Sequence, residues 1–488
     1  MIKFFNPVRS ILAAALLLAG TSFAFAGDLK VAHVFSDHAV LQRETSAPVW
    51  GWGKPGAKVT VNTSWDGKTT SATVAKDGSW RVKVTTGKAG GSYAITVRSG
   101  KESVTISDVA FGEVWLCSGQ SNMEMPMRGF GFQEIEGFRE HLLEASEYAS
   151  RIRIFNIKAD TTHVAQADVQ ATWQYTQPDV FCESSAVGYL FAKRLTKNLD
   201  VPVGIIVNAW GGSRIEPWMS WEAVEQAGVS EEELKTIKAL HERAGGWPQS
   251  TATCWNGRVL PVAGYPIKGI IWYQGCSNIG QDCYDKLQTS MVKLWREAWG
   301  LGDIPFIYAL LAPYEHGDVN GRWRPRFVRT QMDALKTTPN SYAVCTETLG
   351  TDITVHPPYK QEVADMMAMR ALNCAYGQSL GITLDYPEPK DIEYLEDGRV
   401  KIKFTNVWSN LMSISSRDVR GFELAGEDRV FHLAQAQVDW DGETVYVQCA
   451  DVPKPVAVRY SFRNWMGSNL QTSYGIPVPP FRTDDWNE

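Results

Sequence analysis

The feature that most constrains the fold is an alternation of strand-like and helix-like segments from about residue 111 to about residue 385. The strand-like segments are short apolar runs at 152–157, 203–207, 267–273, 306–311 and 342–345. Between them lie segments of helical period at 187–195, 230–240, 285–299 and 359–376. Neighbouring parallel strands need a long crossover connection, which is usually a helix. The alternation therefore predicts an α/β fold built on a doubly wound parallel sheet.

Both ends of the chain have a β pattern instead. In 28–107, alternating segments such as 58–62 and 80–84 are separated by turn dipeptides, which is typical of a small sandwich. After about residue 385 the helical period stops, and strand-like runs resume at 400–404, 445–448 and 456–462. A chain of 488 residues also exceeds what one core usually holds. We therefore expect an N-terminal β-sandwich domain at 27–108, an α/β domain at 109–385 and a C-terminal β-rich domain at 386–488.

The first 26 residues have the pattern of a signal peptide. Lys3 and Arg9 form a basic flank, 11–19 is apolar, and Ala24-Phe25-Ala26 fits a cleavage site. The apolar stretch is too short to span a bilayer stably, and no later run approaches the ~20 apolar residues that a span needs. We expect an exported protein, periplasmic or secreted, that begins at Gly27 after cleavage and has no membrane span.

Charge and cysteine content narrow the classes of partner. The formal net charge of −6 gives no electrostatic reason to expect nucleic acid as a partner. The eight cysteines lack the paired spacing of a structural zinc site, and their pairing cannot be read from the sequence. We expect neither a metal nor an organic cofactor.

Ser121 is the candidate nucleophile. It follows the apolar run 114–117 and lies two residues past Gly119, where the backbone can turn sharply. A strand of a parallel sheet delivers such a side chain to the carboxyl edge, where ligands bind. An isolated Gly-Gln-Ser-Asn is more often a polar turn after a core strand, so the interpretation depends on other residues at the same edge.

His356 is the candidate general base. A serine nucleophile needs a histidine to take its proton, an acid to orient that histidine, and donors for the oxyanion. His356 follows the strand at 342–345 and precedes Pro357 and a helix, so it falls at the same carboxyl edge as Ser121. The remaining histidines lie in the flanking β regions, in helical surface patterns or in polar loops: His33, His38, His141, His163, His241, His316 and His432.

Oxyanion donors besides the Ser121 amide have two sources. The strand at 203–207 ends in a polar segment with Gly211 and Gly212, whose backbone can approach a ligand closely. The strand at 267–273 is followed by Asn278, whose side-chain amide can donate. By contrast, Ser379 fits a Gly-x-Ser-x-Gly pattern but follows a helix, and the nucleophile elbow requires a preceding strand. We interpret Gly377 as a helix C-cap and reject Ser379.

With these residues in place, the chain resembles the sialate O-acetylesterases of the SGNH hydrolase superfamily. The resemblance spans nearly the whole chain after the signal peptide and includes Gly119-Gln120-Ser121-Asn122-Met123. Its blocks lie at 34–43, 112–115, 119–123, 210–218, 255–257, 272–275, 277–278, 356–360, 458–460 and 480–482. The resemblance implies an SGNH-type sheet, with Ser121 as nucleophile and His356 as base. It also implies an oxyanion hole formed by the Ser121 amide, a glycine of the 211–212 pair and Asn278.

Two positions depart from the family pattern. Thr354 stands where the family usually has Asp, and the nearest acid is Asp352, four residues before His356. Asp352 orients His356 if the loop bends differently; otherwise a backbone carbonyl or a more distant acid does so. Cys276 stands where the family usually has Glu. It is a small buried hydrophobe, a disulfide partner of Cys283, or a substrate contact.

The expected function is removal of O-acetyl groups from carbohydrates, most directly from O-acetylated sialic acids, without a cofactor. An enzyme with the same chemistry could instead act on acetylated xylan or another plant polysaccharide. A third hypothesis is a sugar-binding protein whose catalytic site has degenerated. Intact Ser121, His356 and Asn278 argue against that reading.

Overall fold

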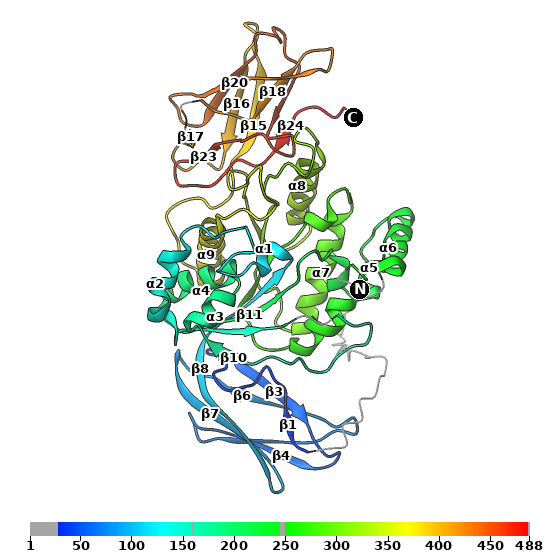
Figure 1. Ribbon diagram of the computed structural model, residues 1–488, viewed down its shortest axis with the longest axis vertical. Coiled ribbons are helices and arrows are strands. Elements are labelled where there is room, and N and C mark those ends of the chain that lie inside the picture. Colours follow the sequence, from blue (N-terminus) through cyan, green and yellow to red (C-terminus); the bar gives the residue numbers. More distant parts are fainter. Residues whose placement is uncertain (1–27, 159–160, 245–248, 415, 417, 487–488) are drawn as a thin grey trace, which may run out of the picture.

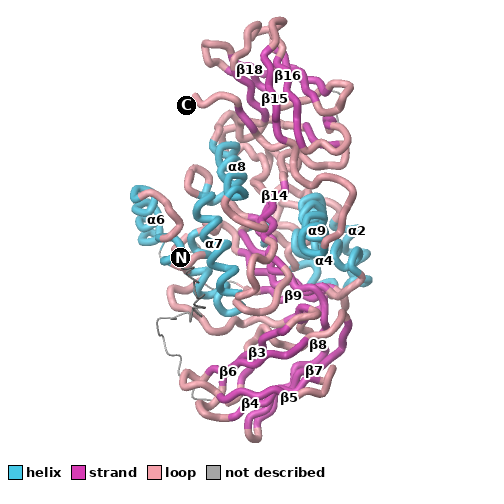
Figure 2. Tube along the Cα trace, turned by 180° about the vertical axis from the view of Figure 1, so that it is seen from behind, coloured by secondary structure: helices cyan, strands magenta, loops and turns pink. Residues whose placement is uncertain are grey.

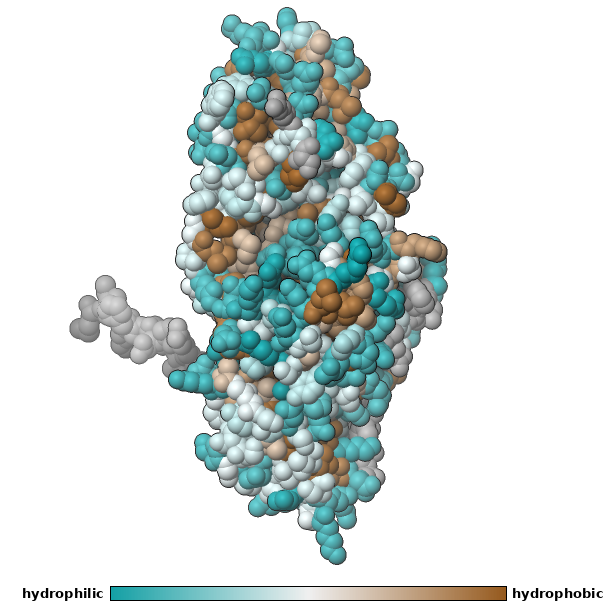
Figure 3. Space-filling view, turned by 60° about the vertical axis from the view of Figure 1, so that its left-hand side comes forward, coloured by the Kyte–Doolittle hydropathy of each residue, from teal (hydrophilic) through white to brown (hydrophobic). Residues whose placement is uncertain are grey.

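The computed structural model describes residues 28–158, 161–244, 249–414, 416 and 418–486. The predicted signal peptide at 1–26 lies outside the described residues. An α/β layer occupies the middle of an elongated molecule, with β regions at its two ends (Figure 1). On the face shown in Figure 3, hydrophobic residues form separate patches among hydrophilic ones. Within the described ranges, none of the helices is long and apolar enough to cross a membrane.

The α/β layer is built on six parallel strands, which confirms the α/β prediction. Their order in the sheet is β9-β11-β8-β12-β13-β14, and the short β10 (Trp173–Tyr175) pairs antiparallel with β9 at the edge. The strands are β8 (Glu102–Gly119), β9 (Ile152–Asn156), β11 (Val203–Ala209), β12 (Gly269–Tyr273), β13 (Phe306–Ala309) and β14 (Ser341–Val344).

Helices cover both faces of this sheet (Figure 2). On one face lie α4 (Ala186–Leu199) and α9 (Lys360–Tyr376), and on the other lie α7 (Tyr284–Trp299) and α8 (Trp323–Asp333). Successive residues of a strand point to opposite faces, so Trp115 packs into the core beside α4 and α9, while Leu116 packs into the core beside α7 and α8. Both faces are therefore buried, which explains why the strands read as continuous apolar runs.

The described residues form five further α-helices around the sheet: α1 (Ser121–Glu124), α2 (Phe138–Tyr148), α3 (Pro178–Glu183), α5 (Trp221–Glu225) and α6 (Glu231–Ala244). The capping box expected at the start of α6 is present. Ser230 Oγ accepts from the Glu233 amide at 3.2 Å, and Glu233 Oε2 accepts from the Ser230 amide at 2.8 Å. The rejected Ser379 does follow a helix, because α9 ends at Tyr376 and Gly377 caps it with φ 67°.

The N-terminal β region comprises β1 (Lys30–Val31), β2 (Val40–Gln42), β3 (Ser46–Trp52), β4 (Lys58–Thr63), β5 (Thr69–Thr73), β6 (Ser79–Thr85) and β7 (Gly90–Ser99). Strand β8 joins this region to the central sheet. Its first half pairs with β7, and its second half runs between β11 and β12. The expected boundary between residues 108 and 109 therefore falls inside one continuous strand.

In the C-terminal β region, the described residues form two four-stranded sheets and a two-stranded one. The first has the order β15 (Glu388–Tyr394), β16 (Val400–Thr405), β21 (Thr444–Gln448), β20 (Gln435–Val438). The second has the order β19 (Phe431–Leu433), β18 (Phe422–Ala425), β22 (Ala457–Tyr460), β24 (Phe481–Arg482), and β17 (Leu411–Ser413) pairs with β23 (Leu470–Thr472).

A buried ion pair fastens this region to the α/β layer. Arg324 of α8 donates to both oxygens of Glu347, at 2.7 and 2.9 Å, and also to the Ser461 carbonyl at 3.2 Å. Because both charged groups are buried, loss of either would leave the other uncompensated.

The order of the parallel strands places a topological switch point at β8. The chain first adds β9 and β11 on one side of β8, and then adds β12, β13 and β14 on the other. Ligands of open α/β sheets bind outside the carboxyl ends of the strands at such a point. The residues that follow β8, β11 and β12 are therefore the first place to look for a site.

Candidate active site

Ser121 stands at the switch point, on a sharp turn between β8 and α1. Gly119 ends the strand with φ 141°, and a Cβ atom added there would lie 2.2 Å from the Tyr273 carbonyl oxygen of β12. Only glycine fits between the two strands in this conformation. Helix α1 begins directly at Ser121, so the serine hydroxyl is presented at the carboxyl edge in a strand–turn–helix arrangement.

The structure brings His356 to this serine. Ser121 Oγ lies 2.7 Å from His356 Nε2, although the two residues are far apart in the sequence. His356 lies in the loop between β14 and α9, as expected from its place after a strand. The distance is within hydrogen-bonding range for proton transfer from the hydroxyl to the imidazole.

The other nitrogen of the imidazole faces Gln133. His356 Nδ1 lies 2.8 Å from Gln133 Oε1, and Gln133 Nε2 donates to Thr354 Oγ1 at 2.7 Å. In this orientation of the amide, Oε1 faces the imidazole and accepts a hydrogen bond from the Nδ1 proton. Nε2 then carries a lone pair and accepts from the Ser121 hydroxyl, which is the tautomer that a general base requires.

The local fold holds Gln133 in a tight turn. Phe130 and Gln133 pair across it through two backbone hydrogen bonds, of 2.9 and 2.6 Å. At its base, Gly129 has φ 78°, and a Cβ there would meet the Gln133 carbonyl oxygen at 2.0 Å. The Phe130 ring lies 5.3 Å from the imidazole, edge to face. The turn therefore positions both a hydrogen-bond partner and an apolar wall for His356.

Asp352, the orienting acid expected from the sequence, does not form the expected hydrogen bond to the imidazole. It is exposed, and no hydrogen bond joins it to His356 among the residues that the structure describes. The cause is a turn in which Thr351 Oγ1 accepts from the Thr354 amide at 3.2 Å, so that the residues between them face solvent. Thr354 Oγ1 accepts from the His356 amide at 3.1 Å. The structure thus differs from the expected Asp352–His356 pair.

The surroundings of His356 keep it uncharged. Burial and, to a smaller extent, the nearby positive charge of Lys360 together lower the pKa of its imidazole to about 4. The amide of Gln133 carries no charge that would oppose these effects. His356 is therefore a neutral base over the whole range above moderately acidic pH.

A buried pair of polar side chains connects the serine and histidine segments. Asn122, next to the nucleophile, donates to the Val355 carbonyl at 3.0 Å. Lys360 Nζ donates to Asn122 Oδ1 at 2.6 Å and to the Pro357 carbonyl at 2.7 Å. We call Asn122 and Lys360 the clamp, because they bind the carbonyls on both sides of His356.

Position 276, where the family usually has Glu, supplies no carboxylate that could pair with Lys360 of the clamp. Cys276 lies near Lys360, and burial raises the pKa of its thiol to about 12, so it is neutral. Burial lowers the pKa of Lys360 to about 7. Cys276 and Cys283 are both free thiols, so the structure does not contain the disulfide considered from the sequence.

Gly211 lies beside the nucleophile. A Cβ atom added at Gly211 would lie 3.5 Å from Ser121 Cβ, in van der Waals contact, and only 2.8 Å from Glu124 Oε2. The Gly211 amide donates to Glu124 Oε2 at 2.6 Å. Gly212 takes φ 71° in the same turn, and its carbonyl accepts from Ser277 Oγ at 2.9 Å. Of the glycine pair, Gly211 is thus the one adjacent to the reacting atom, with its amide bound to a carboxylate.

Asn278 lies inside the protein rather than at the surface of the site. Its side chain is completely buried, and its Oδ1 accepts from the Ile215 amide at 3.0 Å and from Gln274 Nε2 at 2.8 Å. Its Nδ2 donates to Glu216 at 3.1 Å and to Gln281 at 2.5 Å. Both amide protons therefore have protein acceptors, in contrast to the open donor expected from the sequence.

The Ser121 amide is the remaining expected donor. It lies at the first position of α1, where backbone N–H groups have no partner within the helix. No acceptor for it is found within the described part of the chain. The same part of the chain contains no group of three His, Cys, Asp or Glu side chains that could hold a metal ion.

Sequence reasoning missed Gln133, Glu124 and the clamp. Gln133 lies in a glycine-rich polar loop without periodicity, and its partner is 223 residues away. One signal did exist: the missing acid at Thr354 required a different partner for Nδ1. The sequence alone offered no means of choosing that partner among many polar side chains.

Comparison with known proteins shows which family the chain is similar to. Residues 111–372 match the family model described as carbohydrate esterase, sialic acid-specific acetylesterase. A mouse protein named sialate O-acetylesterase is 28% identical, over 98% of this chain and 97% of its own length. Its human counterpart is also 28% identical, over 95% and 93%. The crystal structure of a carbohydrate acetylesterase from Xanthomonas citri superposes with a TM-score of 0.81 at 30% identity, covering 94% of this chain and all of that one.

Proposed function

The chain belongs to the sialic acid-specific acetylesterase family of carbohydrate esterases, and from this premise we propose that it removes O-acetyl groups from O-acetylated sialic acids. Membership makes it a carboxylic ester hydrolase. The observation that carries the proposal is the 2.7 Å distance between Ser121 Oγ and His356 Nε2 at the carboxyl edge of the sheet.

In the proposed reaction, Ser121 Oγ attacks the acetyl carbonyl carbon while His356 Nε2 takes the hydroxyl proton. The tetrahedral intermediate collapses when the C–O bond to the sugar breaks, and His356 returns the proton to the leaving sugar oxygen. Water then attacks the acetyl-serine, with His356 again as the base, and acetate leaves with Ser121 restored. Gln133 keeps the imidazole in the required tautomer throughout.

The amides of Ser121 and Gly211 are the proposed oxyanion donors. The Gly211 amide is bound to Glu124 at 2.6 Å, so the substrate oxygen must take the place of that carboxylate. Desolvation raises the pKa of Glu124, whereas the Gly211 bond and the positive charge of Arg258 act in the opposite direction. Asn278 supports this hole indirectly, because it holds the Ile215 amide and Gln274.

Phe132 provides a surface for the sugar. It stands fully exposed at the tip of the turn that carries Phe130 and Gln133 to His356. An aromatic ring presents a flat apolar face, against which the C–H face of a sugar ring can pack. We place the acetylated sugar against Phe132, with its ester directed to Ser121.

We also propose the finer architecture, which rests on the family resemblance, and the location, which rests on the sequence pattern of the first 26 residues. We propose an SGNH-type sheet for the α/β layer, flanked by an N-terminal β-sandwich that shares strand β8 with it and by a C-terminal β module that begins near residue 386. The segment 1–26 is proposed to direct export to the periplasm or the medium and to be removed there.

A second candidate substrate is an acetylated polysaccharide such as acetylxylan. It is favoured by the likeness to a carbohydrate acetylesterase from Xanthomonas citri. The chemistry at Ser121 would be identical, and only the contacts around the sugar would differ.

Acetate release from the purified chain distinguishes the candidates. Proton NMR would follow 9-O-acetylated N-acetylneuraminic acid and acetylated xylan in parallel, with Ser121→Ala as the matched control. Release from the sialic acid, absent in the control, supports the proposed function, whereas release from xylan alone replaces it with the second candidate. If a folded protein releases acetate from neither substrate, both esterase proposals fail and the reading as a sugar-binding protein gains weight.

A further inference from the structure

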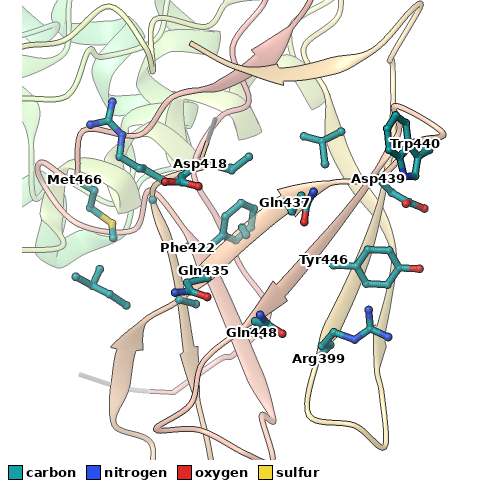
Figure 4. Close-up of a pocket in the computed structure, with 17 residues that line it drawn as sticks. Arg399, Asp418, Phe422, Gln435, Gln437, Asp439, Trp440, Tyr446, Gln448 and Met466 are labelled. Carbon is teal, nitrogen blue, oxygen red and sulfur yellow. The ribbon is translucent and has the colours of Figure 1, made fainter. Parts of the chain in front are cut away.

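A groove of about 1080 Å³ lies in the C-terminal β region, and none of its lining residues belongs to the site at Ser121. It follows strands β20 and β21. Figure 4 shows Trp440, Tyr446 and Arg399 along one side of it, and Asp418 and Met466 at the other. The proposed esterase reaction uses none of these side chains.

The strand register creates an outward face of planar polar groups. Gln437 of β20 lies opposite Tyr446 of β21, and Gln435 lies opposite Gln448. The alternate residues of β21, Val445 and Val447, are completely buried in the core of this region. Because side chains alternate along a strand, the three glutamines and the tyrosine necessarily face the groove.

The outward glutamines are available to a ligand. All three glutamines of this face are exposed to solvent: Gln435, Gln437 and Gln448. Their side chains make no hydrogen bond to other residues in the described part of the chain. A carboxamide offers one acceptor and two donor hydrogens in a plane, which suits the adjacent hydroxyls of a sugar. Three such groups on neighbouring strand positions form a row of hydrogen-bonding sites.

Aromatic side chains complete the face. Trp440 is fully exposed at the end of β20, in a turn closed by the 2.8 Å bond from the Asp439 amide to the Thr444 carbonyl. Tyr446 is partly covered by the Arg399 guanidinium, 4.8 Å from its ring centre. A large apolar side chain in full contact with water costs free energy that burial against a ligand would recover.

The charges along the groove balance. Two arginines, Arg399 and Arg420, and two acids, Asp418 and Asp439, line it. Arg399 is in addition paired with Asp397 at 2.7 Å. A groove without net charge provides no attraction for a polyanion, and its chemistry matches an uncharged ligand rich in hydroxyls.

We propose that this groove binds the chain of a neutral polysaccharide, independently of the esterase reaction. Trp440 packs against a sugar ring, and the row of glutamine amides hydrogen-bonds the hydroxyls of neighbouring sugars. The site would hold the enzyme on a polymer while Ser121 acts on acetyl groups. The binding itself does not depend on which ester is hydrolysed.

The test is affinity electrophoresis in native gels that contain an ester-free polymer. The probes are wheat arabinoxylan, deacetylated konjac glucomannan and barley β-glucan, with polysialic acid as the anionic comparison. We expect at least one neutral polymer to retard the wild-type chain, and Trp440→Ala to weaken that binding about tenfold or more, as is typical of a buried aromatic contact.

Trp408→Ala is the matched control, because Trp408 is also exposed in the same region but does not line the groove. It should migrate as the wild type does, and Gln437→Ala should weaken binding in the same direction as Trp440→Ala. Hydrolysis of 4-nitrophenyl acetate should be equal in all four proteins. The proposal is overturned if no neutral polymer retards the wild type, if only polysialic acid does, or if Trp440→Ala and Gln437→Ala are both retarded like the wild type.

Discussion

Nδ1 of His356 lies 2.8 Å from Oε1 of Gln133, so a neutral amide occupies the position at which an acid would orient the histidine. An amide oxygen can fix the tautomer of the imidazole as well as a carboxylate can. It cannot stabilise the imidazolium by charge, so it does not oppose burial and the charge of Lys360, which lower the pKa of the imidazole. Both properties can be measured separately.

The pH profile should reflect this pairing. The imidazole must be neutral to accept the proton of Ser121, and its pKa is about 4, so kcat/KM should fall only as the pH drops through about 4. In Gln133→Glu, the added carboxylate favours the charged imidazole. The acidic limb of the kcat/KM profile should therefore move upward by about one pH unit or more. The measurement is kcat/KM on 4-nitrophenyl acetate from pH 3 to 8. Identical limbs in the two proteins would show that Gln133 does not face the base.

Alanine substitutions should separate Gln133 from Asp352. Gln133→Ala removes the acceptor for Nδ1 and should lower kcat by about 10- to 100-fold, less than the ~10⁴-fold loss caused by a wrong tautomer in a serine protease. Asp352→Ala removes an exposed carboxylate that does not contact His356 and should leave kcat within about twofold. The opposite ranking would restore Asp352 as the orienting group.

The clamp should act as one unit. Asn122→Ala and Lys360→Met each break the Oδ1–Nζ bond of 2.6 Å and loosen the segment around His356, so each should lower kcat with little change in KM. The double variant should lose much less than the product of the two single losses, with a coupling of about 0.5–3 kcal/mol. Thermal unfolding of the three variants controls for a general loss of stability. Fully multiplicative losses would mean that the two side chains act independently.

Phe132 should affect sugar substrates alone. Phe132→Ala removes the exposed ring near the site and should raise KM several-fold for the O-acetylated glycan, with KM for 4-nitrophenyl acetate unchanged. Leu143→Ala, an exposed apolar residue of α2, is the control and should change neither constant. Equal effects of Phe132→Ala on both substrates would mean that Phe132 stabilises the turn and does not contact the sugar.

The sequence was sufficient to predict those parts of the molecule that local patterns determine. The period of α7 and α9, the capping box of α6 and the apolar runs of β9 and β11 each follow from neighbouring residues. The placement of Ser121 and His356 at one edge needed one further rule, that parallel strands share their carboxyl ends. Both residues follow apolar runs directly, so this rule could be applied to the sequence.

The rest of the site depends on contacts that no local pattern encodes. Gln133 reaches His356 because a tight turn folds back over the sheet, and Asp352 faces solvent because two threonines close a turn around it. Asn278 follows a strand like the other site residues, but Glu216 and Gln281 draw its side chain inward. Such outcomes result from competition between hydrogen-bond partners distant in the sequence.

Covalent labelling tests most directly whether Ser121 is a nucleophile activated by His356. The purified chain would be treated with a fluorophosphonate and digested, and the modified peptide identified by mass spectrometry. We expect one adduct per chain, on Ser121, absent from Ser121→Ala and formed far more slowly in His356→Ala. An enzyme that hydrolyses acetyl esters while Ser121 remains unmodified, or that labels equally well without His356, would contradict the proposed mechanism.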